Sequence, residues 1–123
     1  MMSKLKLIWL VSVLSVLLPP IGHAELIECP QRKIDAIYVQ GDRDDGFPYA
    51  NKLVIRIDAA CGEDAPYNKP GYNQVYIDNS HPAYNGFLSA ALTAYASNKK
   101  VSVYVNNSKS IGSAYELSIL LLQ

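Results

Sequence analysis

Histidine, cysteine and serine are the side chains of this 123-residue sequence from which nucleophilic or acid–base catalysis would have to be built. A Ser-His-Asp system needs a histidine base that a third group holds beside the nucleophile. Beyond residue 24 the sequence has one histidine, His81, and its neighbour Pro82 favours a surface position at a helix start. No local signature selects a nucleophile or two facing carboxylates. We therefore predict no catalytic residue and no enzymatic activity.

Three aspartates close together, Asp42, Asp44 and Asp45, suggest a test for a Ca²⁺ loop. An EF-hand loop needs a ligand at its fifth position, glycine at the sixth and glutamate at the twelfth. Counted from Asp42, those positions hold Gly46, Phe47 and Leu53, so the motif fails. The same segment is too acidic to cradle a phosphate. We predict a solvent-exposed acidic loop, with no metal and no cofactor.

Tyrosine offers recognition chemistry, because it combines a stacking face with a polar tip. Along Lys100–Asn106 the residues alternate, with valines on one face and Ser102, Tyr104 and Asn106 on the other. These three side chains form a candidate binding face, suited to a neutral sugar or a protein surface. The competing interpretation is that tyrosine is simply a good strand former. Nine tyrosines occur, at positions 38, 49, 67, 72, 76, 84, 95, 104 and 115.

The first 24 residues read as a cleaved signal peptide. Lys4 and Lys6 precede the apolar run Leu7–Leu18, and small residues precede a cleavage site after Ala24. The apolar run is too short for a membrane span of roughly 20 residues. We expect a secreted or periplasmic protein, one domain over residues 25–123, with no membrane contact after cleavage.

The exported part retains nine basic and eleven acidic residues, which excludes the basic footprint of a nucleic-acid-binding protein. Its two cysteines, Cys29 and Cys61, are predicted to form a disulfide, because an even pair in an oxidising compartment is normally bonded. The bond would close a 33-residue loop. The loss of chain entropy in the unfolded state would then stabilise the fold by roughly 3–4 kcal/mol.

The residue pattern predicts five strands and one helix in the order β-β-β-α-β-β. The helix begins after a cap at Asn79 or Ser80 and ends near Asn98. It carries an apolar stripe from Tyr84 to Tyr95, in which Leu88, Ala91 and Leu92 are expected to be largely buried. This order matches an OB-like five-stranded barrel with its helix between strands 3 and 4. The alternative is an open α+β sheet with one helix. The predicted strands are 34–40, 52–59, 72–78, 100–106 and 114–122, with loops at 62–71 and 107–113.

Residues 75–105, VYIDNSHPAYNGFLSAALTAYASNKKVSVYV, resemble the strand–helix–strand core of small secreted bacterial OB-fold proteins. That group includes the B subunits of subtilase cytotoxin and of pertussis-like AB5 toxins. The resemblance implies the barrel fold, glycan binding on a sheet face and assembly into rings. The exported part has no tryptophan, unlike the sugar sites of those subunits, and no individual sugar-binding residue matches.

Three function classes follow. We expect a secreted non-catalytic binding module that recognises a glycan or a protein surface. The alternative is a structural or accessory exported protein, such as an inhibitor or an assembly subunit, and a small secreted hydrolase ranks last. The apolar end of the chain, Ile119–Leu122, either closes the fold internally or pairs with another copy, which leaves homo-oligomerisation open.

Overall fold

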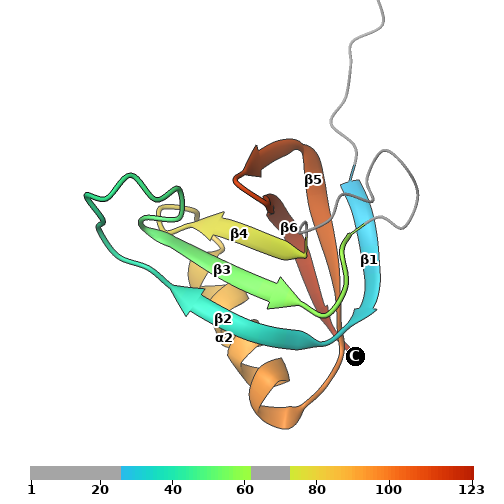
Figure 1. The fold of residues 1–123 in the computed structure, drawn as a ribbon. Helices are drawn as coiled ribbons and strands as arrows, with labels where there is room; N and C mark the ends of the chain where they lie inside the picture. The colour runs from blue at the N-terminus through green and yellow to red at the C-terminus, as the bar shows by residue number, and fades with distance from the viewer. Residues whose placement is uncertain (1–25, 62–72) are drawn as a thin grey trace, which may run out of the picture.

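A computed structural model describes residues 26–61 and 73–123, so the predicted signal peptide and the predicted 62–71 loop lie outside the described residues. The described part is mainly β, with six strands and one helix (Figure 1). In chain order the elements are β1 (Leu26–Arg32), β2 (Ile34–Val39), β3 (Lys52–Ile57), β4 (Gln74–Asp78), α2 (Tyr84–Ser97), β5 (Val101–Ile111) and β6 (Ala114–Leu122).

All six strands belong to one sheet in the order β1-β5-β6-β4-β3-β2. Four neighbouring pairs are antiparallel, and β4 pairs with β6 in parallel. Among the described residues this order has two free ends, so the sheet is not closed and fits the open α+β alternative. The two end strands, β1 and β2, are nevertheless adjacent in sequence, with only Lys33 between them.

Strand β1 was not predicted, because its sequence LIECPQR carries a proline and charges that are unusual in central strands. It lies at the end of the sheet and pairs on one side only, with β5. The pairing register shifts between Cys29 and Arg32, where Gln31 has a φ of 51°. Proline is tolerated at such edges and bulges because the ladder needs no N–H there.

Strand β5 is longer than predicted. It continues to Ile111, so the expectation of a loop over 107–113 is wrong for most of that segment. The polar residues of this extension pair with the start of β6 through a second register shift. The actual turn is short, and Gly112 has a φ of 58°, which favours glycine.

The core fills one face of the sheet. On β3 the side chains of Leu53, Ile55 and Ile57 are fully buried, as their alternation predicted. They pack in one cluster with buried valines of β5 and two alanines of α2. Helix α2 lies behind β2 and β3 in Figure 1. The other face of β3 carries Val54, which is equally buried but belongs to a second, smaller cluster. This second cluster shows that part of the opposite sheet face is covered.

Helix α2 begins later than predicted. Its N-cap is Ala83, without a side-chain cap, whereas Ser80 hydrogen-bonds instead to Asp78. The predicted end is confirmed, because Asn98 adopts the left-handed conformation of a C-cap. Over the described residues, no helix combines the length and apolar character needed to cross a membrane.

The buried line of α2 matches the predicted stripe at Ala91 but not at Leu92. Ala91 and Ala94 are fully buried, while Leu92 and Tyr95 are each about half exposed. Alanines lie closest to the sheet because their small side chains let the helix approach it. The prediction that Leu92 is a core residue is therefore wrong.

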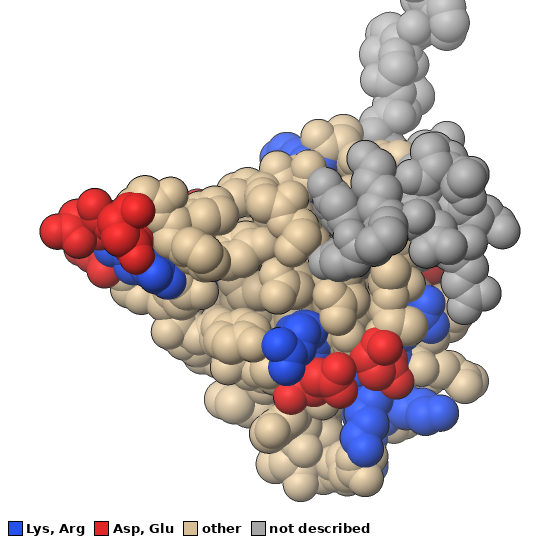
Figure 2. Space-filling model, in the orientation of Figure 1, with Lys and Arg blue, Asp and Glu red and all other residues tan. Residues whose placement is uncertain are grey.

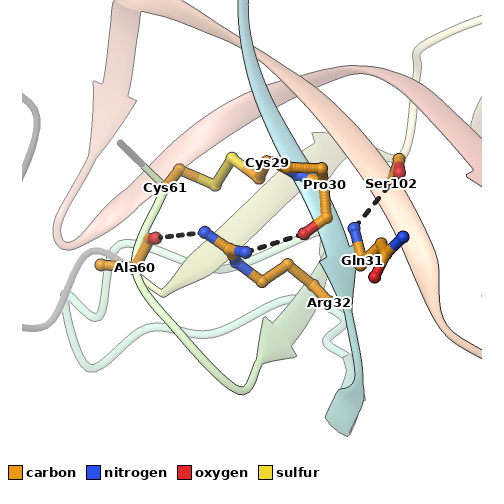
Figure 3. The surroundings of a disulfide bond; sticks show 7 residues. All are labelled: Cys29, Pro30, Gln31, Arg32, Ala60, Cys61 and Ser102. Carbon is orange, nitrogen blue, oxygen red and sulfur yellow. Dashed lines mark hydrogen bonds between the residues drawn. A yellow bond between two sulfur atoms is a disulfide. The ribbon is translucent and has the colours of Figure 1, made fainter. Parts of the chain in front are cut away.

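The predicted disulfide is present and joins Cys29 of β1 to Cys61, which follows β3, with a Cα–Cα distance of 5.1 Å. Arg32 lies beside it and ties the same two segments by donating to the carbonyls of Pro30 and Ala60, at 2.7 and 3.1 Å (Figure 3). Arg32 is 9% exposed, and its Nε has no partner. The two links hold the β1 bulge against the end of β3.

Candidate functional site

A hollow of about 770 Å³ lies beside the loop that joins β2 to β3, and we call it the loop hollow. Its wall combines the end of β2 with the loop, and single residues of β3 and β4 complete it. In Figure 2 one group of charged side chains lies at the tip of this loop and a second group, of both signs, lies in the lower part of the view, whereas the surface directly beside the tip is uncharged. The lining residues are Ile37, Tyr38, Val39, Gln40, Gly41, Arg43, Phe47, Tyr49, Val54 and Gln74.

Arg43 contacts three other residues at the β2 end and tip of the β2–β3 loop. Its guanidinium forms a double hydrogen bond with the carboxylate of Asp45 and a 2.7 Å bond with Oε1 of Gln40. The same group lies 4.5 Å from the ring centre of Phe47, within cation–π range. The hydrogen bonds from Arg43 lower the pKa of Asp45, so this pair stays charged at neutral pH. The loop thereby presents Phe47 in a defined position.

Tyr49 forms the rigid side of the loop hollow. Its ring is 7% exposed and packs with Val54, Tyr76 and Ala114 in the second cluster. Its hydroxyl oxygen lies 3.1 Å from Oε1 of Gln74, to which it donates, and accepts from the backbone N–H of Ser113 at 3.2 Å. The β2–β3 loop is therefore bonded to β4 and to the β5–β6 turn.

The rim of the loop hollow is apolar and open to solvent. Phe47 is 47% exposed, Val39 58% and Tyr38 37%. The hydroxyl of Tyr38 is already bonded to the guanidinium of Arg56 at 3.0 Å. Aromatic and aliphatic side chains left exposed around a concave surface are a typical mark of a recognition site.

The acidic loop is exposed, as predicted. Asp42 accepts a 2.7 Å hydrogen bond from Nδ2 of Asn51. Neither Asp42 nor Asp44 takes part in a salt bridge within the described ranges, whereas Asp45 does. The tip therefore carries more negative than positive charge. Over residues 26–61 and 73–123, no three His, Cys, Asp or Glu side chains are grouped to hold a metal ion.

The predicted binding face lies elsewhere, on β5. Ser102 is 1% exposed, and its hydroxyl oxygen accepts from the N–H of Gln31 and from Nε2 of Gln123. Tyr104 and Asn106 are half-buried, and Oδ1 of Asn106 accepts from Ser108. Tyr104 and Asn106 therefore stay partly accessible, whereas the hydroxyl of Ser102 is buried and already hydrogen-bonded within the protein. None of the three lines the loop hollow, and binding at this face stays a prediction.

His81 is exposed, and its Nδ1 accepts the N–H of Ala83 at 3.0 Å. It shapes the turn before α2. The residue pattern did not point to the loop hollow, although a signal existed: the segment Phe47-Pro48-Tyr49 places two aromatics in the turn before β3, of which Phe47 is exposed. Exposed aromatics in a turn are worth more as a binding signal than aromatics inside a strand, where packing explains them.

Comparison with known proteins shows no match of this chain to any protein-family model, curated protein or solved structure.

Proposed function

We propose that the protein is a non-catalytic binding module of the extracellular or periplasmic space, which recognises a glycan or a protein surface at the loop hollow. The observation that carries this proposal is the exposed apolar rim of Tyr38, Val39 and Phe47 around a concave surface backed by the fixed ring of Tyr49. Such preorganisation lowers the entropic cost of binding. The Cys29–Cys61 disulfide supports an oxidising compartment.

An OB-like barrel is the architecture that we propose for this module. If β1 and β2 are counted as one strand bent at the Gln31 bulge, the chain has five strands with its helix after the third. The sheet order then begins and ends on the same strand, as a barrel requires. OB-folds bind oligosaccharides and oligonucleotides on the face between their first and last hairpin loops. The loop hollow adjoins the first of these loops, and Tyr49 in its wall is bonded to the β5–β6 turn, which supports this comparison. The near-neutral charge disfavours nucleic acid.

A second candidate function, an assembly or inhibitor subunit, is supported by apolar residues at the end of β6. Ile119, Leu121 and Leu122 are 38%, 45% and 47% exposed. Alternation along β5 and β6 places Ile119 and Leu121 on the same face as Tyr104. A second copy or another subunit could cover this face, so homo-oligomerisation stays part of this alternative.

The test measures the binding of two variants of the exported protein to a glycan array and to a panel of proteins from the compartment into which the protein is exported. Phe47→Ser alters the rim of the loop hollow, and Ile119→Ser is the matched control on β6. We expect Phe47→Ser to weaken binding at least tenfold with an unchanged melting temperature, and Ile119→Ser to bind normally. The reverse pattern would move the site to β5 and β6. No binding to either panel would contradict the binding function.

A further inference from the structure

One long side of the loop hollow is the backbone of a sheet edge. Five consecutive residues, Ile37 to Gly41, line it, so its wall follows the chain and not one face of β2. The described sheet ends at β2, and within residues 26–61 and 73–123 no further backbone hydrogen bond reaches Ile37 or Val39. At the start of β2, in contrast, Ile34 and Asp35 share a smaller hollow with the end of α2. The accessible edge is therefore the second half of β2.

The ladder between β2 and β3 fixes which backbone groups this edge presents. Gln40 donates its N–H to the carbonyl of Lys52 at 3.0 Å, so residue 40 faces β3. In an antiparallel ladder alternate residues point the same way, so Tyr38 faces β3 as well. The N–H and C=O groups of Ile37 and Val39 must then point outward, away from β3. Such a row of unpaired groups is a template for another strand.

From these observations we infer that the partner of the loop hollow is an extended polypeptide segment, which adds as a strand to the free edge of β2 and places apolar side chains against Phe47, Val39 and Tyr38. This inference rests on the proposed binding function and names the class of its ligand. Main-chain hydrogen bonds would supply affinity, and the hollow would select alternate side chains.

Polar side chains around the hollow favour a peptide over a sugar. Sugar binding needs several free donors and acceptors, because each buried hydroxyl without a partner is costly. Here the guanidinium of Arg43 is held by Asp45 and Gln40, and Tyr49 and Tyr38 hydroxyls are held by Gln74 and Arg56. The outward N–H and C=O groups of β2, in contrast, have no partner among the described residues, and another extended backbone matches their spacing.

Charge at the loop tip specifies the partner further. Asp42 and Asp44 follow Gly41, where the free edge of β2 ends. Neither carboxylate forms a salt bridge with a cation among the described residues. A lysine or arginine at the matching end of the added strand would complement them. The partner segment is therefore apolar at alternate positions and basic at one end.

The experiment uses the exported protein and an array of 12-residue peptides with valine or isoleucine at alternate positions and lysine, serine or glutamate at one end. We expect lysine-ended peptides to bind and backbone N-methylated copies of them to fail. Val39→Pro should weaken binding at least tenfold, because it removes an outward N–H without touching the β3 ladder. Val39→Thr, which keeps that N–H, is the matched control. Asp42→Asn/Asp44→Asn should abolish the preference for lysine.

Hydrogen exchange gives a second readout that depends on the edge itself. The amide of Tyr38 should be protected in the free protein, whereas that of Val39 should become protected only when peptide is bound. Peptides that bind equally well after N-methylation, or to Val39→Pro, would overturn the inference.

Other outcomes separate this inference from the proposed function. Glycan binding that Phe47→Ser removes, without any peptide binding, would overturn the peptide partner and leave the binding site in place. A dimer that Val39→Pro dissociates, measured by light scattering at micromolar concentration, would identify a second copy as the occupant and also overturn it. No binding to the glycan array or to the peptide array would contradict both the peptide inference and the proposed binding function.

Discussion

At the scale of single residues, the contacts of Tyr49 matter most for the candidate site. One ring links the β2–β3 loop to β4 and to the β5–β6 turn through a pair of hydrogen bonds. Gly112 belongs to this arrangement, since a Cβ there would lie 2.9 Å from the hydroxyl oxygen of Tyr49. The loop hollow therefore depends on a glycine more than sixty residues away in sequence.

Gly112→Ala tests this dependence. At a φ of 58° an alanine costs about 1–2 kcal/mol, and its Cβ must also displace Tyr49. Gly46→Ala is the control, because Gly46 has a φ of 79° but nothing within 4 Å of its Cβ position. Chemical unfolding should show a larger loss for Gly112→Ala. Equal losses would mean that Tyr49 does not constrain the turn.

Asp78 gives a prediction for the dependence of stability on pH. Hydrogen bonds from the N–H and hydroxyl of Ser80, followed by one from Lys52, lower the pKa of Asp78 below 3.8. The folded state therefore binds this proton less tightly than the unfolded chain does. The resulting stability is complete above the ordinary pKa and is lost as the pH falls through the lowered one.

Asp78→Asn should accordingly be less stable than the unmodified protein at pH 7, and the difference should disappear at pH 2–3. Asp35→Asn is the control, because Asp35 is exposed and accepts no hydrogen bond within the described residues. Urea unfolding at several pH values measures both. A difference that stays constant down to pH 2 would show that the carboxylate is not its source.

At the scale of elements, helix α2 shows how packing departs from a periodic pattern. Leu92→Ala should cost less than about 1 kcal/mol, because half of that side chain already faces solvent. Ala91→Leu should cost about 1–3 kcal/mol, because Ala91 is fully buried against the sheet. Thermal unfolding of Leu92→Ala decides between this geometry and the predicted stripe, because the stripe requires a loss of about 2–5 kcal/mol for that variant.

How far the sequence predicted the elements depended on how strongly each one is patterned. Alternation located β3 and the first half of β5, whereas β2, β4 and β6 were located by their β-branched, aromatic and apolar residues, and the αL residue Asn98 lies where the helix was expected to end. It failed for β1 and for the second half of β5, because edge strands and bulged strands need no apolar face. It also failed for the candidate site. The loop hollow forms where the β2–β3 loop, the edge of β2 and the distant β5–β6 turn come together. Local residue spacing cannot predict contacts between segments so far apart in sequence.

At the scale of the whole molecule, the disulfide and Arg32 link β1, at one end of the sheet, to the segment that follows β3, the strand next to the other end. Cys29→Ser/Cys61→Ser should lower the free energy of unfolding by about 2–5 kcal/mol. Arg32→Met in the oxidised protein is an informative companion, since it removes a buried cation together with two carbonyl contacts. Denaturant unfolding with and without reductant measures each contribution. An unchanged midpoint for the double serine variant would contradict the prediction.

The position of Cys29 three residues into β1 also determines how the protein responds to mechanical force. A pull on Leu26 can peel only Leu26, Ile27 and Glu28 from β5 before the load reaches a covalent bond. The bond passes that load directly to Cys61, so β2, the loop hollow and β3 carry no tension. The 31 residues between the cysteines would contribute no length to the stretched chain, roughly 100–110 Å less than for the reduced protein. A loop shielded in this way would keep its shape when the chain is pulled at Leu26.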